Sequence, residues 1–323
     1  MNVFMTGGTG FIGRYLARKL TDHGFSVTIA TRSPEHHQNS NSDKPATNPG
    51  DQVSGGPLHN APRIRYVPLA DDLTASVDGC DVVVNLAGES LFGKRWTSSV
   101  KKRLYDSRIG TTRDLVTAIG NADSKPALFL SASAVGYYGD RGEERITEDM
   151  GSGSDFLATI CRDWENESLK ASDLGVRVAN PRIGIALGRG GGALGPMLPV
   201  FQAFLGGSLG PGSQFFPWIH IEDLCRSFLH VIRNESMEGP YNATGPEPVT
   251  MDAFTSELGR VLSRPSLFKV PQFALNVALG EAATMLTTSL RAVPAKLEQD
   301  GFSFEYADAG RALESLLTDK ETE

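Results

Sequence analysis

Apolar side chains up to Leu187 follow two periods. Short continuous apolar runs, typical of strands buried on both faces, alternate with stretches in which apolar residues recur every three to four positions, as in an amphipathic helix. Ile12, Leu16 and Leu20 form such a helical face between the first two runs. This repetition of strand, helix and strand favours a parallel sheet covered by helices, an α/β fold of the Rossmann-type doubly wound class.

One long segment interrupts this pattern. Residues 33–62 are rich in Ser, Asn, Pro and Gly and nearly free of large apolar side chains, so they cannot bury enough surface to offset their ordering entropy. We expect a disordered surface insertion there. The expected strands are 2–6, 25–32, 63–69, 80–88, 126–134 and 175–187, and the longer expected helices are 98–122 and 155–172.

The pattern changes after Leu187, where glycine-rich loops alternate with apolar and aromatic residues. This composition suits the lining of a substrate cleft. We therefore expect a Rossmann domain over 1–180 and a smaller C-terminal substrate lobe over 181–323. From Ser266 onward, apolar helical stretches indicate a small packing subdomain within that lobe.

The sequence TGGTGFIG joins the first expected strand to the first helix. In this position Gly7 permits a tight turn, Gly10 lets the backbone approach a pyrophosphate, and Gly13 allows close helix packing. The first helical turn, with Phe11 and Ile12, faces the phosphates. The strand before the motif and the helix after it favour a dinucleotide site over a simple glycine turn.

The second expected strand ends in Thr31 and Arg32, where an NAD site usually has an acidic residue for the ribose 2′-hydroxyl. A guanidinium at that corner suits a 2′-phosphate through charge-assisted hydrogen bonds, so NADP is the expected cofactor. The alternative is that Arg32 is only a solvated loop residue.

The fourth expected strand ends in Leu86, Ala87 and Gly88, which are smooth enough to pass beneath the cofactor. On the following helix, Arg103 and Arg108 lie five positions apart. One of the two could reach the cofactor, although charges on a helix surface are usually just solvated.

Composition and charge exclude several classes of partner. The 323 residues carry a formal net charge of -7 without a basic run, so neither nucleic acid nor a membrane is an expected partner. Three isolated cysteines and six histidines show no metal-ligand spacing, so no metal is expected, and unpaired cysteines fit a reducing compartment. With no long apolar run and no leader before the first strand, the expected location is cytoplasmic.

Further segments carry a more specific resemblance. NLAGES, SASAVGYYGDRG, RIGIALGRGGGALGPML, GPGSQFFPWIHIEDL and VPAKLEQDGFSFEY resemble an atypical branch of the extended short-chain dehydrogenase/reductases, the epimerase family proteins of the SDR39U1/YfcH type. The resemblance implies an NADP-binding Rossmann fold, a family-specific C-terminal domain at about 266–313, and a homodimer as one option. It also implies cofactor contacts at Thr31, Arg32, Leu86, Ala87, Arg108 and Leu187.

The resemblance exposes a missing catalytic pair. Extended members of the superfamily carry Ser or Thr after the fifth strand and Tyr-x-x-x-Lys on the next helix. There the Tyr exchanges a proton with the substrate oxygen, and the Lys favours the phenolate and holds the nicotinamide ribose. Ser133 stands at the serine position, but alignment on Glu165 puts Leu157 in place of the Tyr and Cys161 in place of the Lys.

Three alternatives remain for the proton donor. Tyr137 or Tyr138, close after Ser133, could supply a hydroxyl or could simply pack beneath the cleft. Cys161 could act as a thiol, but without an adjacent His or Lys it is more typical of a small buried apolar residue. Transfer through water or the substrate is the third alternative.

A second departure bears on the substrate. Nucleotide-sugar relatives bind the diphosphate with the Arg of a G-x-G-x-Q-x-R segment. Aligned on Gly210, Gly212 and Gln214, that position is Phe216, which cannot neutralise a diphosphate. A nucleotide sugar is therefore disfavoured. The aromatic rings of QFFPW either face a flatter apolar ligand or belong to the core, and His220 is expected to be a hydrogen-bonded structural residue.

The sequence therefore predicts an NADP-dependent oxidoreductase or epimerase-like enzyme for a small-molecule substrate, with Ser133 polarising a substrate oxygen. The alternative is a non-catalytic NADP-binding sensor or scaffold, with cell division as one process that it would serve. The missing Tyr and Lys favour that alternative, whereas Ser133 and the glycine-lined cleft favour the enzyme.

Overall fold

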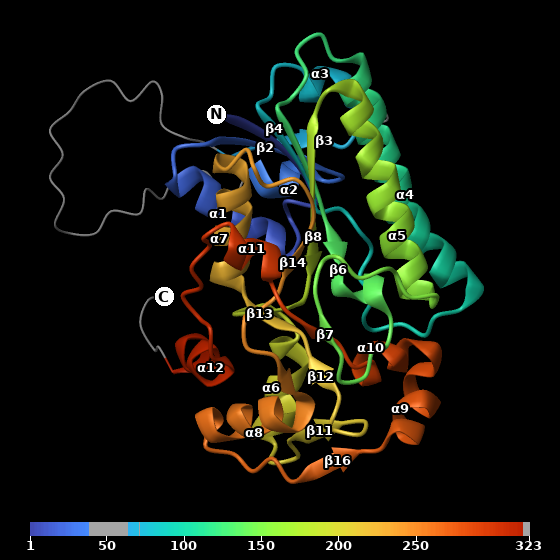
Figure 1. Cartoon of the computed structure of the whole chain (residues 1–323), viewed down its shortest axis with the longest axis vertical. Coiled ribbons are helices and arrows are strands. Elements are labelled where there is room, and N and C mark those ends of the chain that lie inside the picture. Colours follow the sequence, from blue (N-terminus) through green and yellow to red (C-terminus); the bar gives the residue numbers. More distant parts are fainter. Residues whose placement is uncertain (39–63, 71, 319–323) are drawn as a thin grey trace, which may run out of the picture.

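A parallel sheet organises the larger part of the molecule (Figure 1). The computed structural model describes residues 1–38, 64–70 and 72–318. The strand order is β3, β2, β1, β4, β5, β8 and β14, with the short β6 also paired to β8. The sheet consists of β1 (Asn2–Thr6), β2 (Ser26–Thr31), β3 (Ile64–Pro68), β4 (Val82–Asn85), β5 (Leu128–Ser131), β6 (Ser133–Ala134), β8 (Arg177–Ile183) and β14 (Gly239–Ala243).

The order of the strands reverses between β1 and β4. The chain moves outward from β1 through β2 to β3 and then returns to place β4 on the other side of β1. Such a reversal puts the carboxyl ends of β1 and β4 side by side, at the point where open α/β sheets bind their ligands. The doubly wound Rossmann-type fold is thus confirmed.

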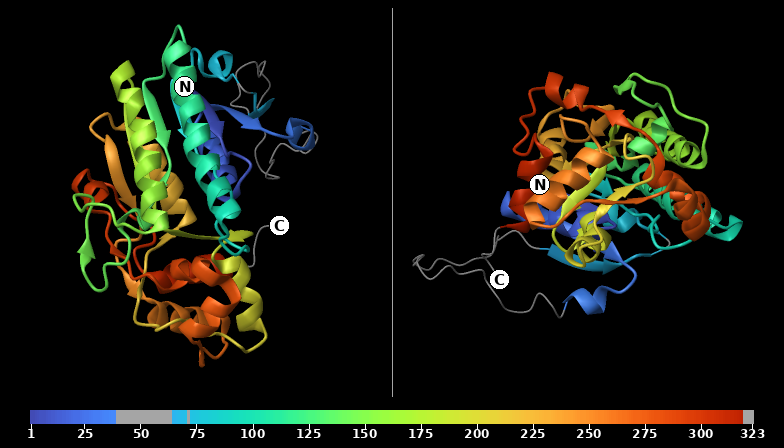
Figure 2. Two further views of the ribbon diagram at one scale, coloured as in Figure 1. Left: turned by 90° about the vertical axis from the view of Figure 1, so that its right-hand side faces the viewer. Right: turned by 90° about the horizontal axis from the view of Figure 1, so that it is seen from below.

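Helices cover both faces of the sheet, because successive strand residues point to opposite sides. Met5 and Val84 pack with α1 and α7 in one core, whereas Phe4 and Val83 pack with α4 in the other. Figure 2 shows α4 and α5 side by side on one face of the sheet. The elements around the sheet are α1 (Phe11–Asp22), α3 (Thr74–Val77), α4 (Ser98–Asn121), η1 (Val135–Tyr138), α5 (Phe156–Leu169), η2 (Lys170–Leu174), α7 (Ile221–Arg233) and α11 (Ala295–Gln299).

A second lobe, in the lower half of Figure 1, follows the carboxyl end of β8. Its own core includes Phe216, Trp218, Phe254 and Leu313. Its sheets are small: β9 (Ile185–Gly188) with β10 (Gly191–Gly192) and β13 (Trp218–His220), β11 (Gly207–Leu209) with β16 (Phe268–Val270), β12 (Phe215–Phe216) with β15 (Val249–Thr250), and β7 (Arg145–Ile146) with β17 (Arg291–Ala292). Its helices are α6 (Leu194–Gln202), α8 (Met251–Leu262), α9 (Gln272–Leu279), η3 (Gly280–Ala283), α10 (Thr284–Thr287) and α12 (Ala309–Leu317).

The sequence pattern predicted a boundary between the two lobes at residue 180, but the structure does not divide there. That boundary falls inside β8, and β8 pairs in parallel with β14, which comes from the segment expected to form the substrate lobe. Helix α7 also returns to the larger lobe, where Leu224 and Phe228 pack in the same core as α1. A division by sequence position fails because the chain enters the second lobe and comes back.

The expected strand 175–187 is broken into β8 and β9 at Gly184. A Cβ atom at Gly184 would overlap the backbone carbonyl of Pro217, so the chain approaches its neighbour more closely than any side chain allows. The Ile185 N–H then donates to the Pro217 carbonyl, 2.6 Å away. This turn carries the chain from the sheet into the second lobe.

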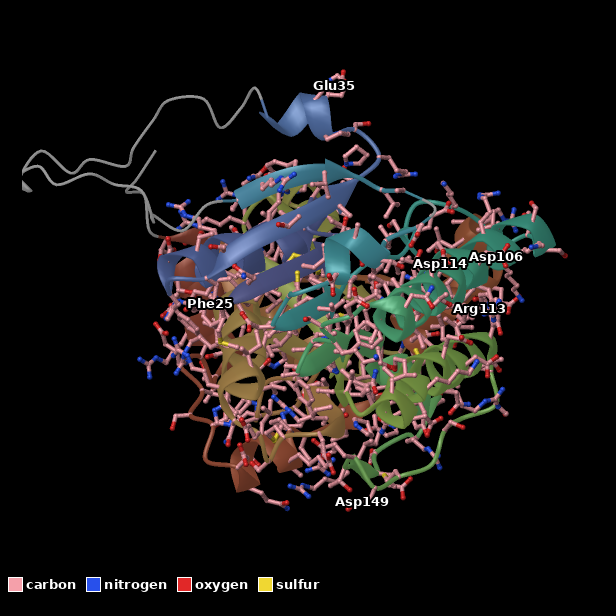
Figure 3. The ribbon with its side chains drawn as sticks, turned by 90° about the horizontal axis from the view of Figure 1, so that it is seen from above. Phe25, Glu35, Asp106, Arg113, Asp114 and Asp149 are labelled. Carbon is pink, nitrogen blue, oxygen red and sulfur yellow. The ribbon has the colours of Figure 1, made fainter. Side chains whose placement is uncertain are left out.

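The expected insertion 33–62 lies mostly outside the described residues. Its first part is ordered: α2 (Pro34–Gln38) follows β2 and packs near β3. In Figure 3, Glu35 marks this helix beyond the edge of the sheet. The expectation of disorder is therefore wrong for 34–38, where Pro34 starts a helical turn.

Replacing Phe228 by Ala should destabilise the fold by about 3–5 kcal/mol, because its ring is fully buried between α7 and the sheet. The matched control is Phe273→Ala on α9, whose ring is 72% exposed, and we expect a change within about 0.5 kcal/mol. Urea unfolding of both variants measures the difference. Equal midpoints would contradict the assignment of Phe228 to the core.

Candidate cofactor site and active site

The glycine turn between β1 and α1 lies against the end of β4. Gly7 has φ +71°, and a Cβ atom there would overlap the Leu86 carbonyl. A Cβ atom at Gly13 would overlap the backbone of Gly7 and Gly8. Gly10 is different: an added Cβ would meet only the Gly7 carbonyl oxygen, at 3.2 Å, and the residue is exposed. The protein's own packing therefore requires glycine at 7 and 13, while at Gly10 it leaves space outside.

The first turn of α1 offers free backbone donors. Gly10 is the N-cap and has no side chain to cap the helix, and no acidic residue lies in the first turn. The N–H groups of Phe11, Ile12 and Gly13 have no hydrogen-bond partner among the described residues. Such groups bind phosphate oxygens well. The Phe11 ring itself packs on the glycine hairpin β9–β10, so its predicted cofactor contact would use the backbone.

Thr31 and Arg32 lie at the carboxyl end of β2, as predicted. Thr31 is buried, and its Oγ1 accepts a 3.4 Å hydrogen bond from the Ser33 N–H. Arg32 is exposed and forms no ion pair with any described residue. The guanidinium is thus available to a ligand that reaches the end of β2.

A buried polar cluster fixes the end of β4. Asn85 accepts a hydrogen bond from Thr6 on β1 (2.8 Å) and donates to Thr112 on α4 (2.8 Å) and Ser131 on β5 (3.2 Å). Its Oδ1 also accepts from the Ala87 N–H at 3.2 Å. These bonds hold Leu86, Ala87 and the exposed Gly88 at the sheet edge, beside the glycine turn.

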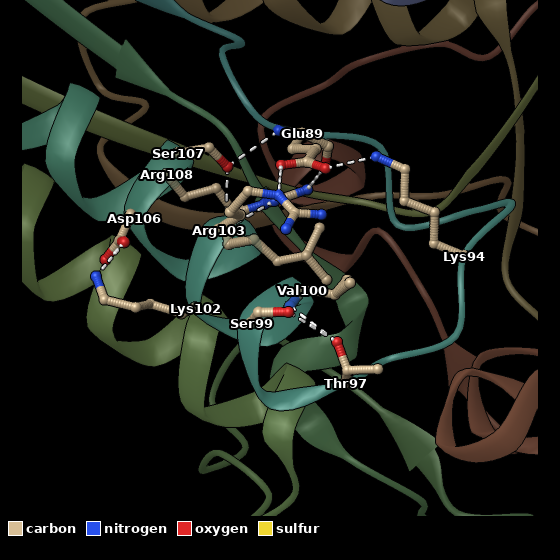
Figure 4. Close-up of polar contacts among 11 residues, drawn as sticks. Glu89, Lys94, Thr97, Ser99, Val100, Lys102, Arg103, Asp106, Ser107 and Arg108 are labelled. Atoms are coloured by element: carbon tan, nitrogen blue, oxygen red, sulfur yellow. Dashed lines mark hydrogen bonds and ion pairs between the residues drawn. The ribbon is translucent and has the colours of Figure 1, made fainter.

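The next residue, Glu89, ties the same loop to α4 (Figure 4). Its N–H donates to Ser107 Oγ at 3.0 Å, and its carbonyl accepts from Arg108 Nη2 at 3.0 Å. Its carboxylate pairs with Lys94 at 2.8 Å and Arg103 at 3.3 Å. Of the two arginines considered from the sequence, Arg103 is therefore an exposed partner of Glu89, whereas Arg108 is buried against Gly88.

Ser133 is held by a buried ion pair. Its hydroxyl donates to the Glu165 carboxylate at 2.6 Å, and Glu165 receives two hydrogen bonds of 2.9 Å from Arg182. All three side chains are buried. Because the hydroxyl proton is directed to Glu165, the Ser133 oxygen presents its lone pairs, and not its proton, to anything else that approaches.

The two tyrosines of η1 have different surroundings. Tyr138 is fully buried, accepts a hydrogen bond from Arg182 at 2.8 Å and donates to Asn242 at 2.7 Å. Burial raises the pKa of its hydroxyl to about 12. Tyr137 is partly exposed, its ring lies 3.6 Å from the Arg182 guanidinium, and its hydroxyl has no partner among the described residues. Between the two, only Tyr137 has a hydroxyl free to meet a ligand.

Leu157 and Cys161 face η1 from α5, where the Tyr and Lys of related enzymes are expected. A Cβ atom at Gly136 would lie 3.4 Å from the Leu157 Cβ and 4.0 Å from the Cys161 Sγ. Burial raises the pKa of the Cys161 thiol to about 12. Cys161 is thus a neutral thiol near neutral pH and does not supply the missing charge.

Several other candidates belong to the second core. Phe216 and Trp218 are buried with Phe254. Their rings therefore belong to the core and do not face a ligand. Leu187 is fully buried in the same core, and its strand β9 is paired on both sides. Any contact of Leu187 with a cofactor would need its backbone, because its side chain points into that core.

Sequence reasoning missed Arg182, Glu148 and Asn242. Arg182 is buried in β8, and its Nη1 also donates to the Glu148 carbonyl at 3.2 Å. Glu148 continues the cluster to α11, because its carboxylate accepts from the N–H groups of Asn242 and Lys296. A charged side chain in a strand expected to be buried on both faces was the signal that could have identified Arg182, because buried charges are nearly always paired.

Within the described residues there is no group of three or more His, Cys, Asp or Glu side chains arranged to hold a metal ion. The same residues include no helix that combines the length and apolar character needed to span a membrane.

Comparison with known families decides the classification. The model for the NAD dependent epimerase/dehydratase family matches residues 3–243, and a domain of unknown function, DUF1731, matches 270–316. The chain belongs to the NAD dependent epimerase/dehydratase family. The second match covers most of the region expected to form a family-specific C-terminal domain.

Relatives of the expected type span nearly the whole chain. It is 39% identical to the epimerase family protein SDR39U1 homolog, chloroplastic, of Arabidopsis thaliana, over 98% of this chain and 87% of the relative. It is 36% identical to the epimerase family protein YfhF of Bacillus subtilis over the full length of both. Human SDR39U1 (isoform 2), in a crystal structure with NADPH, shares 30% sequence identity with this chain. The two structures superpose with a TM-score of 0.84, over 99% of this chain and 100% of that one. The resemblance to this family is thereby confirmed.

His220 at the start of α7 is structural, as expected. Its Nδ1 accepts from the Glu222 N–H at 3.1 Å, so the neutral ring carries its proton on Nε2, 3.2 Å from Ser315 Oγ. The ring stacks on Tyr306 at 3.8 Å. Burial lowers the pKa of His220 from 6.5 to about 4.

This pKa predicts a loss of stability in acid. Below pH 6.5 the unfolded chain is protonated at His220, whereas the folded chain stays neutral there down to about pH 4. The free energy of unfolding therefore falls as the pH is lowered through that interval. The loss should reach about 3 kcal/mol at pH 4. Urea unfolding at pH 7 and pH 4.5 should show a smaller drop for His220→Asn, which keeps an N-cap side chain but does not titrate. An equal drop in both proteins would contradict the assignment.

Proposed function

We propose that this chain is an NADP(H)-dependent oxidoreductase or epimerase-like enzyme acting on a small molecule. The observation that carries the proposal is the turn at Gly7–Gly13, which leaves space outside Gly10 and directs three free N–H groups outward. This arrangement fits a pyrophosphate. Human SDR39U1, whose crystal structure contains NADPH, supports the same cofactor for this chain.

The preference for the phosphorylated cofactor rests on Arg32. It replaces the acidic residue that would bind a free ribose hydroxyl, and it forms no ion pair with any described residue. A guanidinium donates two parallel hydrogen bonds to a phosphate. Bound NADP would supply hydride exchange, while the residues around Ser133 position the substrate.

Ser133 would act as a hydrogen-bond acceptor. Because Glu165 takes its proton, Ser133 Oγ suits a substrate hydroxyl better than a carbonyl oxygen. Tyr137 lies in η1, directly after β6, and its hydroxyl is free. This hydroxyl is then the candidate group for donating a hydrogen bond to the same substrate. Tyr138 would hold Arg182 in place.

A nucleotide sugar remains the disfavoured substrate. Phe216, at the position of the diphosphate-binding Arg, is buried in the second core, so it leaves no cation at that point. We therefore expect a substrate that is smaller or less charged than a nucleotide sugar. The family match gives no support to the non-catalytic sensor or scaffold.

Arg32→Ala should separate the two cofactors. We expect NADPH affinity to fall about 10- to 100-fold, because one or two charge-assisted hydrogen bonds are lost, while NADH affinity changes little. Calorimetric titration of both cofactors into the stripped protein measures the effect. Equal affinities of the parent protein for NADPH and NADH would remove the argument for the 2′-phosphate.

Catalysis is tested with a broad panel of alcohols and carbonyl compounds, following NADPH absorbance. Ser133→Ala should lower any turnover found about 10²- to 10⁴-fold, because the substrate oxygen loses its positioning group. Turnover by Ser133→Ala at the parental rate would exclude Ser133 from the site.

A further inference from the structure

A pocket lies at the ends of α1 and α7 that are remote from the glycine turn. Its volume is about 550 Å³, and its lining includes His23, Arg226, His230, Arg233, Phe302 and Ser303. Helix α1 begins at Phe11, beside the glycine turn, and His23 is its C-cap. At about 1.5 Å per residue, the helix places the pocket roughly 18 Å from that turn. The pocket is therefore separate from the candidate cofactor site.

Three of the lining side chains form a basic face on α7, which Figure 1 shows beside α1. Arg226, His230 and Arg233 follow one another at helical spacing, so they lie on one side of the helix. His23 meets the same pocket from α1, and the described residues that line it include no Asp or Glu. A cation in a last helical turn stabilises the helix dipole, which accounts for His230 and Arg233 but not for the convergence of basic groups from two helices.

Two of these basic side chains are free to bind a ligand. Arg233 is exposed, and its guanidinium forms neither an ion pair nor a hydrogen bond with any described residue. His23 Nδ1 donates to the Lys19 carbonyl at 2.8 Å, which leaves Nε2, on the other side of the ring, without a partner among the described residues. An anion beside His23 would favour the protonated ring, whose Nε2 then donates to it.

The carboxylate nearest to His230 is already occupied. Asp300 accepts hydrogen bonds from His230 Nε2 at 2.7 Å, from Ser236 Oγ at 2.8 Å and from the Asn234 side chain. Asp300 itself is not among the residues that line the pocket. It therefore orients the His230 ring without presenting a negative charge to a ligand.

Arg226 is held in position by its neighbours. Its Nη1 pairs with Asp223 at 2.8 Å and lies 3.9 Å from Glu305. Its guanidinium also lies 5.4 Å from the centre of the Phe302 ring. Asp223 is buried and accepts two backbone N–H groups besides, so its charge is shared among several donors. The Arg226 side chain remains 32% exposed, as a fixed cation at the pocket wall.

We propose that this pocket binds a phosphorylated small molecule at a site separate from the cofactor. Its volume falls within the range of about 300–1,000 Å³ that is typical of small-molecule sites, so it has room for more than the phosphate. A phosphate monoester carries about two negative charges and three acceptor oxygens, which several converging cations match better than they match a carboxylate. Arg233 and His23 would bind the phosphate directly, with Arg226 beside them.

Histidine NMR of the full chain tests the site, with inorganic pyrophosphate as the probe at constant ionic strength. The side-chain signals of His23 and His230, assigned with His23→Gln and His230→Gln, should shift and saturate because both rings line the pocket. His220, buried against Tyr306 at the other end of α7, is the internal control and should not shift. Pyrophosphate also suits the glycine turn, so the titration is repeated with excess NADP⁺, and the His23 shift should persist.

A pair of matched variants tests the role of Arg233. Arg233→Gln should weaken pyrophosphate binding about 10-fold, because it removes a charge-assisted hydrogen-bond donor. Arg311→Gln on α12 makes the same change in net charge at another exposed arginine, outside the pocket lining, and should leave the affinity within about twofold.

Four results would overturn the proposal. The first is that the His23 and His230 signals stay in place throughout the titration. The second is an equal affinity of Arg233→Gln and Arg311→Gln, which would show that the probe responds to net charge alone. The third is a His23 shift that excess NADP⁺ abolishes, which would contradict a separate site. The fourth is tighter binding of citrate than of pyrophosphate at these signals, which would show that the pocket selects carboxylates.

Discussion

The buried ion pair between Glu165 and Arg182 holds the candidate active site together. It links α5 to β8, takes the hydroxyl proton of Ser133, and holds Tyr138 at the other end. Loss of one partner would leave the other charge buried and unpaired, at a cost of about 3–5 kcal/mol. Through Tyr138 the same network reaches Asn242 on β14, so the site and the sheet edge depend on one pair of charges.

This pair also explains the chemistry that the chain retains. Glu165 and Arg182 neutralise one another, and together they fix the direction of the Ser133 hydroxyl. The site therefore keeps an oriented oxygen although α5 carries neither of the usual polar groups. On α4, two backbone carbonyls hold the buried guanidinium of Arg108.

Local patterns in the sequence were enough to predict the glycine turn, the first five strands and the two long helices, because each depends on neighbouring residues. Partners distant in sequence could not be derived in this way. The pairing of β8 with β14 joins segments about 60 residues apart and overturned the expected domain boundary. In the same way, a sequence cannot decide whether Phe216 lines a pocket or fills a core, since both need the same apolar ring.

The return of the chain to form β14 has a consequence for biosynthesis. On the ribosome, β8 is complete near residue 183, but the strand that covers its outer edge ends only at Ala243. Until then the nascent sheet exposes an unpaired edge, which is prone to pair with other chains. The whole intervening part of the smaller lobe must therefore emerge before the edge of the nucleotide-binding sheet is protected.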